Sequence, residues 1–183
     1  MEHDAVIDAY DRLRNLKLVG AELGIKWQTV YTILRRNNVP VVGDKIRYGS
    51  ETDRLAATTE QEFKRLVPDA VSQNEFKYQA RIDFMVHGMR VDIKSSRLNR
   101  GMKNSPGLRW AFCIKKQEFC ADFIVCFGYL ADMNYRVFML PGEMVQKYQS
   151  IAIGQEGRSK WLDFEVQPEE LAPFFKEAAS VAA

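Results

Sequence analysis

Residues 81–94 carry the pattern that most restricts how this chain can fold. The segments RIDFMV (81–86) and MRVDIK (89–94) each alternate apolar and polar residues, and only His87 and Gly88 separate them. Such alternation predicts two half-buried strands, and a two-residue connection predicts a tight β-hairpin. In a hairpin built on this turn, Asp83 lies directly opposite Asp92.

The hairpin is expected to gather two carboxylates and one ammonium group on one face. Opposed residues on a shared face have Cβ atoms about 4.5–5.5 Å apart, where like charges destabilise a sheet. Lys94 follows Asp92 by two residues and therefore shares its face. Two carboxylates at this separation suit Mg²⁺ or Mn²⁺, which keeps several waters. The lysine can orient or activate one such water, or stabilise charge that develops on a phosphate.

The chain changes from a helical to an alternating pattern near residue 40. Residues 4–36 contain no proline and are expected to be helical, and a linker marked by proline and glycine occupies 37–50. We therefore expect an all-α module over residues 1–40 and a second domain over residues 41–183.

The second domain is expected to be an α/β or α+β fold. Its first helix has Ser50 or Thr59 as the N-cap and ends at Val67, before Pro68. A last helix follows Pro168. Strands are expected at about 81–86, 89–95, 109–115, 122–128 and 135–140, and short helices near 116–121 and 142–148.

The segment LVGAELGIKWQTVYTILRR (18–36) resembles a helix-turn-helix. Gly20 lets the second helix approach the first closely, and Gly24 suits the left-handed turn between them. The exposed face of the second helix is then rich in groups that reach phosphates and base edges. The predicted DNA-binding residues are Lys26, Trp27, Gln28, Thr29, Tyr31, Arg35 and Arg36. The alternative is a helical hairpin whose arginines are only solvated.

A basic loop follows the proposed active strand, because residues 94–117 include seven Lys or Arg residues and no acid. A flexible basic segment beside a metal site neutralises phosphates. Arg97, Arg100 and Lys103 are the predicted DNA contacts, and Ser96 is a further candidate for a phosphate hydrogen bond.

Composition removes several other classes of protein. The 183 residues are 46% hydrophobic and 27% charged, as in soluble globular proteins, and the net charge is only +2. Two histidines and three cysteines, without a CxxC pair, argue against a His/Cys zinc site and against a disulfide framework. The sequence has no GxGxxG, P-loop or GxSxG motif. An acidic N-terminus and short apolar runs predict a cytoplasmic protein in a reducing compartment.

The helix at 51–67, Asp83 and the triplet Asp92-Ile93-Lys94 together resemble the PD-(D/E)xK nuclease superfamily. The resemblance spans roughly residues 50–140, although Ile82 stands where the family has proline. It implies a restriction-endonuclease-like mixed β-sheet flanked by helices. It also implies Mg²⁺-dependent phosphodiester cleavage, with Mn²⁺ as a substitute ion, and it makes Asp83, Asp92 and Lys94 the catalytic residues.

The acidic helix residue of the family pattern has three candidates. Glu60 lies beside the apolar stripe of its helix, because apolar residues follow it at three and seven positions. Glu62 suits the site equally well by helix angle, but it also completes a capping box with Thr59. Glu51 is further from the stripe. Glu60 is taken as the predicted acid, with Glu62 as the alternative.

These features predict a DNA endonuclease whose helix-turn-helix aids recognition. Homing or phage-type, restriction-like and junction-resolving enzymes all remain open. A DNA-binding regulator on an inactive nuclease scaffold is the alternative, although two facing carboxylates argue against it. An RNA-directed nuclease is disfavoured by the helix-turn-helix. A homodimer would supply the second active site that a double-strand break requires, with residues 171–175 as a candidate interface.

Overall fold

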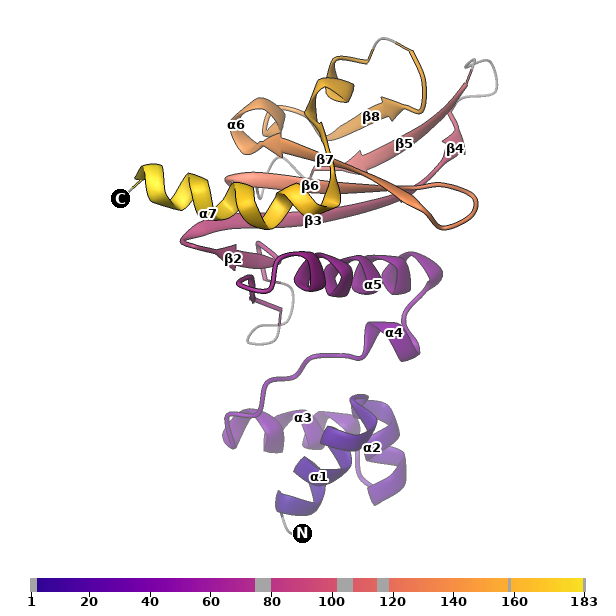
Figure 1. The fold of residues 1–183 in the computed structure, drawn as a ribbon. Helices are drawn as coiled ribbons and strands as arrows, with labels where there is room; N and C mark the ends of the chain where they lie inside the picture. Colours follow the sequence, from indigo (N-terminus) through magenta and orange to yellow (C-terminus); the bar gives the residue numbers. More distant parts are fainter. Residues whose placement is uncertain (1–2, 75–79, 102–106, 115–118, 158, 183) are drawn as a thin grey trace. The chain divides into compact units, whose positions relative to one another are not determined.

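The computed structural model describes residues 3–74, 80–101, 107–114, 119–157 and 159–182, and it contains two compact units (Figure 1). One unit comprises Met1–Arg54 with Gln73–Ala80, and the other comprises Leu55–Ser72 with Arg81–Ala183. Each unit is described by itself. Among the described residues, no helix is long and apolar enough to cross a membrane.

The first unit is built from four helices. They are α1 (His3–Leu13), α2 (Leu16–Leu23), α3 (Trp27–Arg36) and the short α4 (Lys45–Tyr48). The helical expectation for this stretch is confirmed, with a break at Arg14, whose φ is 48°. The side chain of Asn15 caps the next helix by accepting the backbone N–H groups of Lys17 and Leu18. The core of the unit consists of Val6, Ala9, Tyr10, Val19, Val30, Ile33 and Leu34.

Two glycines permit the tight packing of α2 and α3. Gly24 ends α2 at φ 65°, a left-handed conformation that strains other residues. A Cβ atom at Gly20 would lie 2.6 Å from the backbone oxygen of Ile25, so only glycine fits there.

The second unit contains a six-stranded mixed sheet and a three-stranded sheet. The larger sheet has the order β1 (Val71–Ser72), β2 (Phe84–Val86), β3 (Met89–Arg97), β6 (Phe123–Tyr129), β7 (Tyr135–Pro141) and β9 (Glu165–Val166). Only β3 and β6 pair in parallel; the other neighbours are antiparallel. The smaller, antiparallel sheet has the order β4 (Asn99–Arg100), β5 (Leu108–Cys113) and β8 (Ser150–Gly154).

The two faces of the large sheet have separate cores. Helices α5 (Glu51–Leu66) and α7 (Leu171–Ala182) pack on one face. The core on this face includes Phe63, Phe84, Val91, Ile93, Val125, Phe127, Leu171 and Phe175. The small sheet, helix α6 (Gly142–Val145) and the 3-10 helix η2 (Lys160–Phe164) cover the opposite face (Figure 1). That core includes Trp110, Phe112, Ile124, Cys126, Phe138, Val145, Ile153 and Trp161.

The start of α5 decides between the two expected N-caps. The hydroxyl of Ser50 accepts the N–H of Asp53 at 3.2 Å, and the Asp53 carboxylate accepts the N–H of Ser50 at 3.1 Å. Thr59 is instead buried within the helix, where its hydroxyl donates to the carbonyl oxygen of Leu55 at 2.7 Å. The Thr59 alternative, and with it the capping-box explanation of Glu62, is therefore wrong.

Other expectations need correction. Of the short helix expected at 116–121, residues 116–118 lie outside the described residues, and residues 119–121 are not helical. The strands β1, β4, β8 and β9 were not expected, since three of them have only two residues and β8 follows a segment without a turn signal. In the candidate interface 171–175, Leu171 and Phe175 are fully buried in the core.

Candidate active site

The β2–β3 hairpin has the predicted register. Phe84 pairs with Val91 and Val86 pairs with Met89. Asp83 precedes these pairs, and its N–H bonds to Val91, so the regular pairing ends before Asp83 and Asp92. His87 and Gly88 both have positive φ, at 47° and 84°, as a type I′ turn requires. The register and the turn therefore confirm the predicted β-hairpin.

The structure brings Asp83, Asp92 and Lys94 together. Asp83 lies just before β2; its N–H donates to the carbonyl oxygen of Val91 at 3.1 Å, and its Oδ2 accepts the N–H of Ile93 at 2.7 Å. Lys94 Nζ lies 2.6 Å from Asp92 Oδ2, and the side chains are 23% and 14% exposed, respectively. The backbone bond of Asp83 and the ion pair hold all three groups before any ligand arrives.

The two carboxylates and the lysine perturb one another. Burial raises the pKa of Asp92 to about 7; the attraction of Lys94 opposes the shift, and the charge of Asp83 and its hydrogen bond to Asp92 increase it. Burial disfavours the charged form of Lys94, but the attraction of Asp92 outweighs it and raises the pKa of the lysine. At neutral pH the lysine is therefore charged, while Asp92 holds its proton more tightly than an ordinary aspartic acid does.

The floor of the cluster is apolar. Asp92 and Lys94 alternate with Val91 and Ile93, so they lie on the face opposite α5. Their neighbours on β6 are Ile124 and Cys126, both fully buried. Burial also raises the pKa of the Cys126 thiol, so this sulfur stays protonated. An apolar floor strengthens the electrostatic interactions of the charged groups above it.

The carboxyl groups of Asp83 and Asp92, which are joined by a hydrogen bond, suit a hard divalent cation. Within the described part of the chain, no group of three or more His, Cys, Asp or Glu side chains could hold a metal ion. Mg²⁺ binds through one or two carboxylates and completes its shell with water and substrate phosphate. The pair Asp83 and Asp92 meets that requirement, whereas a structural zinc site does not fit.

The two candidate acids on α5, Glu62 and Glu60, have different surroundings. Glu62 accepts hydrogen bonds from the Arg65 guanidinium at 2.7 and 2.8 Å and from the Tyr135 hydroxyl at 2.5 Å. The hydrogen bond from Arg65 is the main cause that lowers the pKa of Glu62 to about 2. These contacts assign Glu62 to the joint between α5 and β7. Glu60 is half-buried on the same helix, and its catalytic role stays a prediction.

Asp122, which the sequence interpretation did not assign, and Ser96 hold β3 in place. Asp122 accepts the backbone N–H of Arg90 at 2.7 Å and pairs with its guanidinium, which fixes the start of β3 against β6. Ser96, considered above as a phosphate contact, is buried, and its hydroxyl accepts the N–H of Ala111 at 3.0 Å. It therefore links β3 to β5.

Two of the three basic residues predicted to contact DNA after β3 lie within the described residues. Arg97 at the end of β3 and Arg100 on β4 are both exposed. Lys103 lies outside the described residues. Their contact with DNA stays a prediction.

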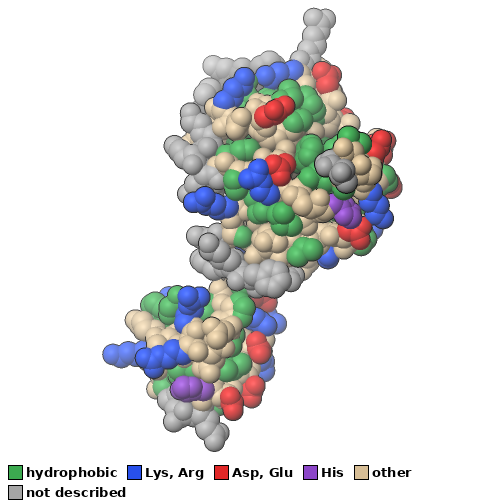
Figure 2. Space-filling model, turned by 90° about the vertical axis from the view of Figure 1, so that its left-hand side faces the viewer, with side chains coloured by type: hydrophobic (Ala, Val, Ile, Leu, Met, Phe, Trp, Pro, Cys, Tyr) green, Lys and Arg blue, Asp and Glu red, His purple; other side chains and the backbone are tan. Residues whose placement is uncertain are grey.

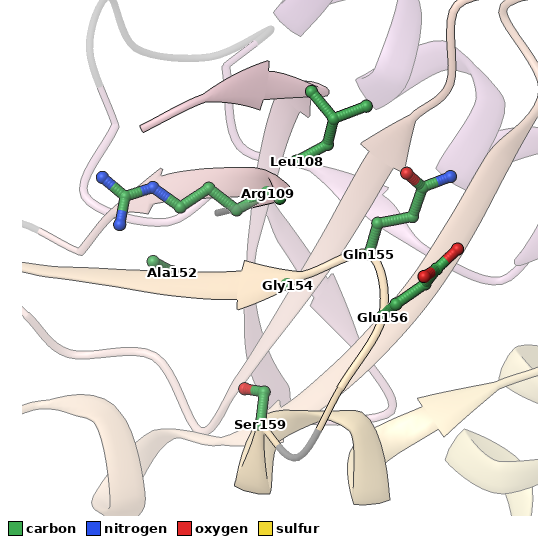
Figure 3. Close-up of a pocket in the computed structure, with 8 residues that line it drawn as sticks. Leu108, Arg109, Ala152, Gly154, Gln155, Glu156 and Ser159 are labelled. Atoms are coloured by element: carbon green, nitrogen blue, oxygen red, sulfur yellow. The ribbon is translucent and has the colours of Figure 1, made fainter. Parts of the chain in front are cut away.

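A pocket of about 480 Å³ lies where β5 begins and β8 ends (Figure 3). Its lining residues are Gly107, Leu108, Arg109, Ala152, Gly154, Gln155, Glu156 and Ser159. In Figure 3 the Arg109 side chain extends away from Gln155 and Glu156, so the charged groups do not converge. The pocket includes none of Asp83, Asp92 and Lys94 and is not the candidate active site.

The predicted recognition surface on α3 is accessible. Trp27 and Tyr31 are each 43% exposed, while Val30 and Leu34 are fully buried. The predicted polar and basic contacts are also exposed: Lys26, Gln28, Thr29, Arg35 and Arg36. Figure 2 shows Lys and Arg side chains on one side of this unit, while on the other side acidic side chains lie among further Lys and Arg. DNA binding by this surface stays a prediction.

No family model and no curated protein matches this chain. Its fold is similar to the solved structure of a bacterial homing endonuclease, I-Ssp6803I, with a TM-score of 0.51 and 14% sequence identity. The match covers 73% of this chain and 97% of that one. The chain therefore has a nuclease-like α/β fold, in agreement with the fold class expected from the sequence.

Proposed function

We propose that this protein is a metal-dependent DNA endonuclease that hydrolyses phosphodiester bonds. The observation that carries the proposal is the cluster of Asp83, Asp92 and Lys94, held together on a nuclease-like sheet. The strong upward shift of the Asp92 pKa supports it, since perturbed groups of this kind gather at functional sites.

Each residue of the cluster has a distinct role in this mechanism. Asp83 and Asp92 hold Mg²⁺, or Mn²⁺ in its place. The bound ion supplies Lewis-acid activation of water and of the phosphate. Lys94 stays cationic beside Asp92 and orients the attacking water or stabilises charge on the phosphoryl oxygens. Water adds to phosphorus as one ester P–O bond breaks, and a proton from the water ends on the leaving oxygen, which departs as an alcohol. Glu60 lies on α5, which packs on the other face of the sheet, and it stays the predicted helix acid.

Cleavage assays test this assignment. The purified protein is incubated with plasmid, linear, branched and single-stranded DNA, with Mg²⁺ or EDTA. We expect Mg²⁺-dependent cleavage that Asp92→Ala abolishes, by a factor of at least about 10², while the variant stays folded. Lys94→Ala should lower the rate much more than the metal affinity. Lys176→Ala, on the opposite face of the sheet, is the control lysine variant. Unchanged cleavage by Asp92→Ala would remove the assignment.

The first unit is proposed to bind DNA as a helix-turn-helix. Its exposed Trp27 and Tyr31 and its basic α3 surface support this role. Deleting residues 1–40 should leave a folded protein of residues 41–183 that cuts weakly and binds DNA less tightly. An insoluble fragment would contradict the division at residue 40.

The substrate panel also separates the subclasses. Site-specific cuts in duplex DNA indicate a homing, phage-type or restriction-like enzyme, and paired cuts in branched DNA indicate a resolvase. A folded protein that binds DNA but never cuts it would be a DNA-binding regulator. A homodimer is proposed for paired cuts, and sedimentation with and without DNA tests it. A monomer that only nicks its DNA would exclude the dimer.

A further inference from the structure

Two lysines and two aromatic residues form a cluster at the surface of the second unit. Lys147 and Tyr148 follow helix α6, whereas Lys160 and Trp161 begin the 3-10 helix η2. The strand β8 separates these two pairs along the chain. The cluster forms only because both segments fold onto the same core.

The two ammonium groups converge on one phenol ring. Nζ of Lys147 lies 5.4 Å from the centre of the Tyr148 ring, and Nζ of Lys160 lies 5.3 Å from it. Lys160 also donates a hydrogen bond to the Tyr148 hydroxyl at 3.1 Å and lies 4.5 Å from the Trp161 ring. These contacts limit the motion of Lys160 and direct both charges to one point.

The positive charge of this cluster is not balanced by a carboxylate. Neither lysine forms an ion pair with any acidic side chain that the structure describes. The hydrogen bond from Lys160 lowers the pKa of Tyr148, and the charge of Lys147 adds to this effect. A phenol is thus held in a positive field, which is the environment that an anionic ligand favours.

The cluster lies on the same face and near the same end of the sheet as the candidate active site. Asp122 bonds to Arg90 at the start of β3, and the N–H of Gly142 at the start of α6 donates to the carbonyl oxygen of Asp122 at 2.7 Å. Strand β6 lies between β3 and β7, so α6 begins about two strand spacings, or about 10 Å, from the start of β3.

We propose that Lys147, Tyr148 and Lys160 form a second phosphate-binding site, which holds the DNA backbone a few nucleotides from the scissile bond. The proposal rests on the endonuclease function proposed above and adds a contact outside α3 and the basic loop. Both ammonium groups contact a backbone phosphate, and the Tyr148 hydroxyl adds a hydrogen bond. Such contacts position DNA without reading its sequence.

Salt dependence of DNA binding tests the site. Fluorescence anisotropy measures the affinity for a labelled DNA duplex in EDTA, from 50 to 200 mM NaCl. Each phosphate contact contributes about 0.9 to the slope of log affinity against log salt concentration. Both lysines hold one phosphate, so the double variant Lys147→Ala/Lys160→Ala should lower the slope by about 0.9, and each single variant should lower it by less. The pair Lys147→Arg/Lys160→Arg should keep the parent slope.

Lys176→Ala is the matched control, because α7 lies on the opposite face of the sheet. An unchanged slope in the lysine-to-alanine variants, or an equal loss in the control, would overturn the proposed site. If the parent protein still cuts DNA with Mg²⁺ in that case, only this site is rejected. A parent protein that binds no DNA rejects both proposals. The single variants keep the test decisive if the double variant melts at a lower temperature.

Discussion

The stability of the metal-free protein should depend on the proton held by Asp92. The pKa of this carboxyl rises from the ordinary value of 3.8 to about 7 in the folded state, mainly through burial. Between these values the folded protein binds a proton that the unfolded chain has released, so the free energy of unfolding falls as pH rises. From pH 5 to pH 8 the expected loss is about 2 to 3 kcal/mol.

Other shifted groups act outside this pH range. The lowered pKa of Glu62, about 2, contributes stability that is lost only as pH falls below the ordinary value of 4.5. The raised pKa of Lys94 contributes stability that is lost only at alkaline pH, above the ordinary value of 10.5. The change between pH 5 and pH 8 therefore isolates Asp92 when the parent is compared with Asp92→Asn.

Urea unfolding at pH 5, 6, 7 and 8 in EDTA provides the measurement. The free energy of unfolding of the parent should fall by about 2 to 3 kcal/mol relative to Asp92→Asn, and Asp163→Asn, an exposed control, should follow the parent. Mg²⁺ should stabilise the parent more at pH 8 than at pH 5, because the ion competes with the proton. Parallel pH profiles for the parent and Asp92→Asn would refute this account of the site.

Two further predictions concern the helices. Gly20→Ala should destabilise the first unit by about 1 to 3 kcal/mol, because the added Cβ would lie 2.6 Å from the backbone oxygen of Ile25. Thermal unfolding checks this, with Gly43→Ala as the control at a position with open space. Glu62→Gln should lower stability and keep cleavage, since it weakens the contacts to Arg65 and Tyr135. Glu60→Gln should keep stability and lower cleavage. Loss of cleavage only in Glu62→Gln would make Glu62 the helix acid.

Local patterns were sufficient to predict the hairpin that carries the candidate active site. Its strands are neighbours in the chain, the two-residue turn sets the register, and the period of two places Asp92 and Lys94 on one face. The glycines of the first unit were predicted for the same reason, because the turn after α2 and the close approach to α3 involve residues only a few positions apart.

Tertiary structure decided what depends on distant segments. Glu62 and Tyr135 are 73 residues apart, and only the packing of α5 on the sheet brings them together. The same packing buries Thr59 against Tyr129. Lys147 and Lys160 meet at Tyr148 because β8 pairs with β5 and returns the chain to the same core. Periodicity reports which side of an element is buried, but not which distant element covers it.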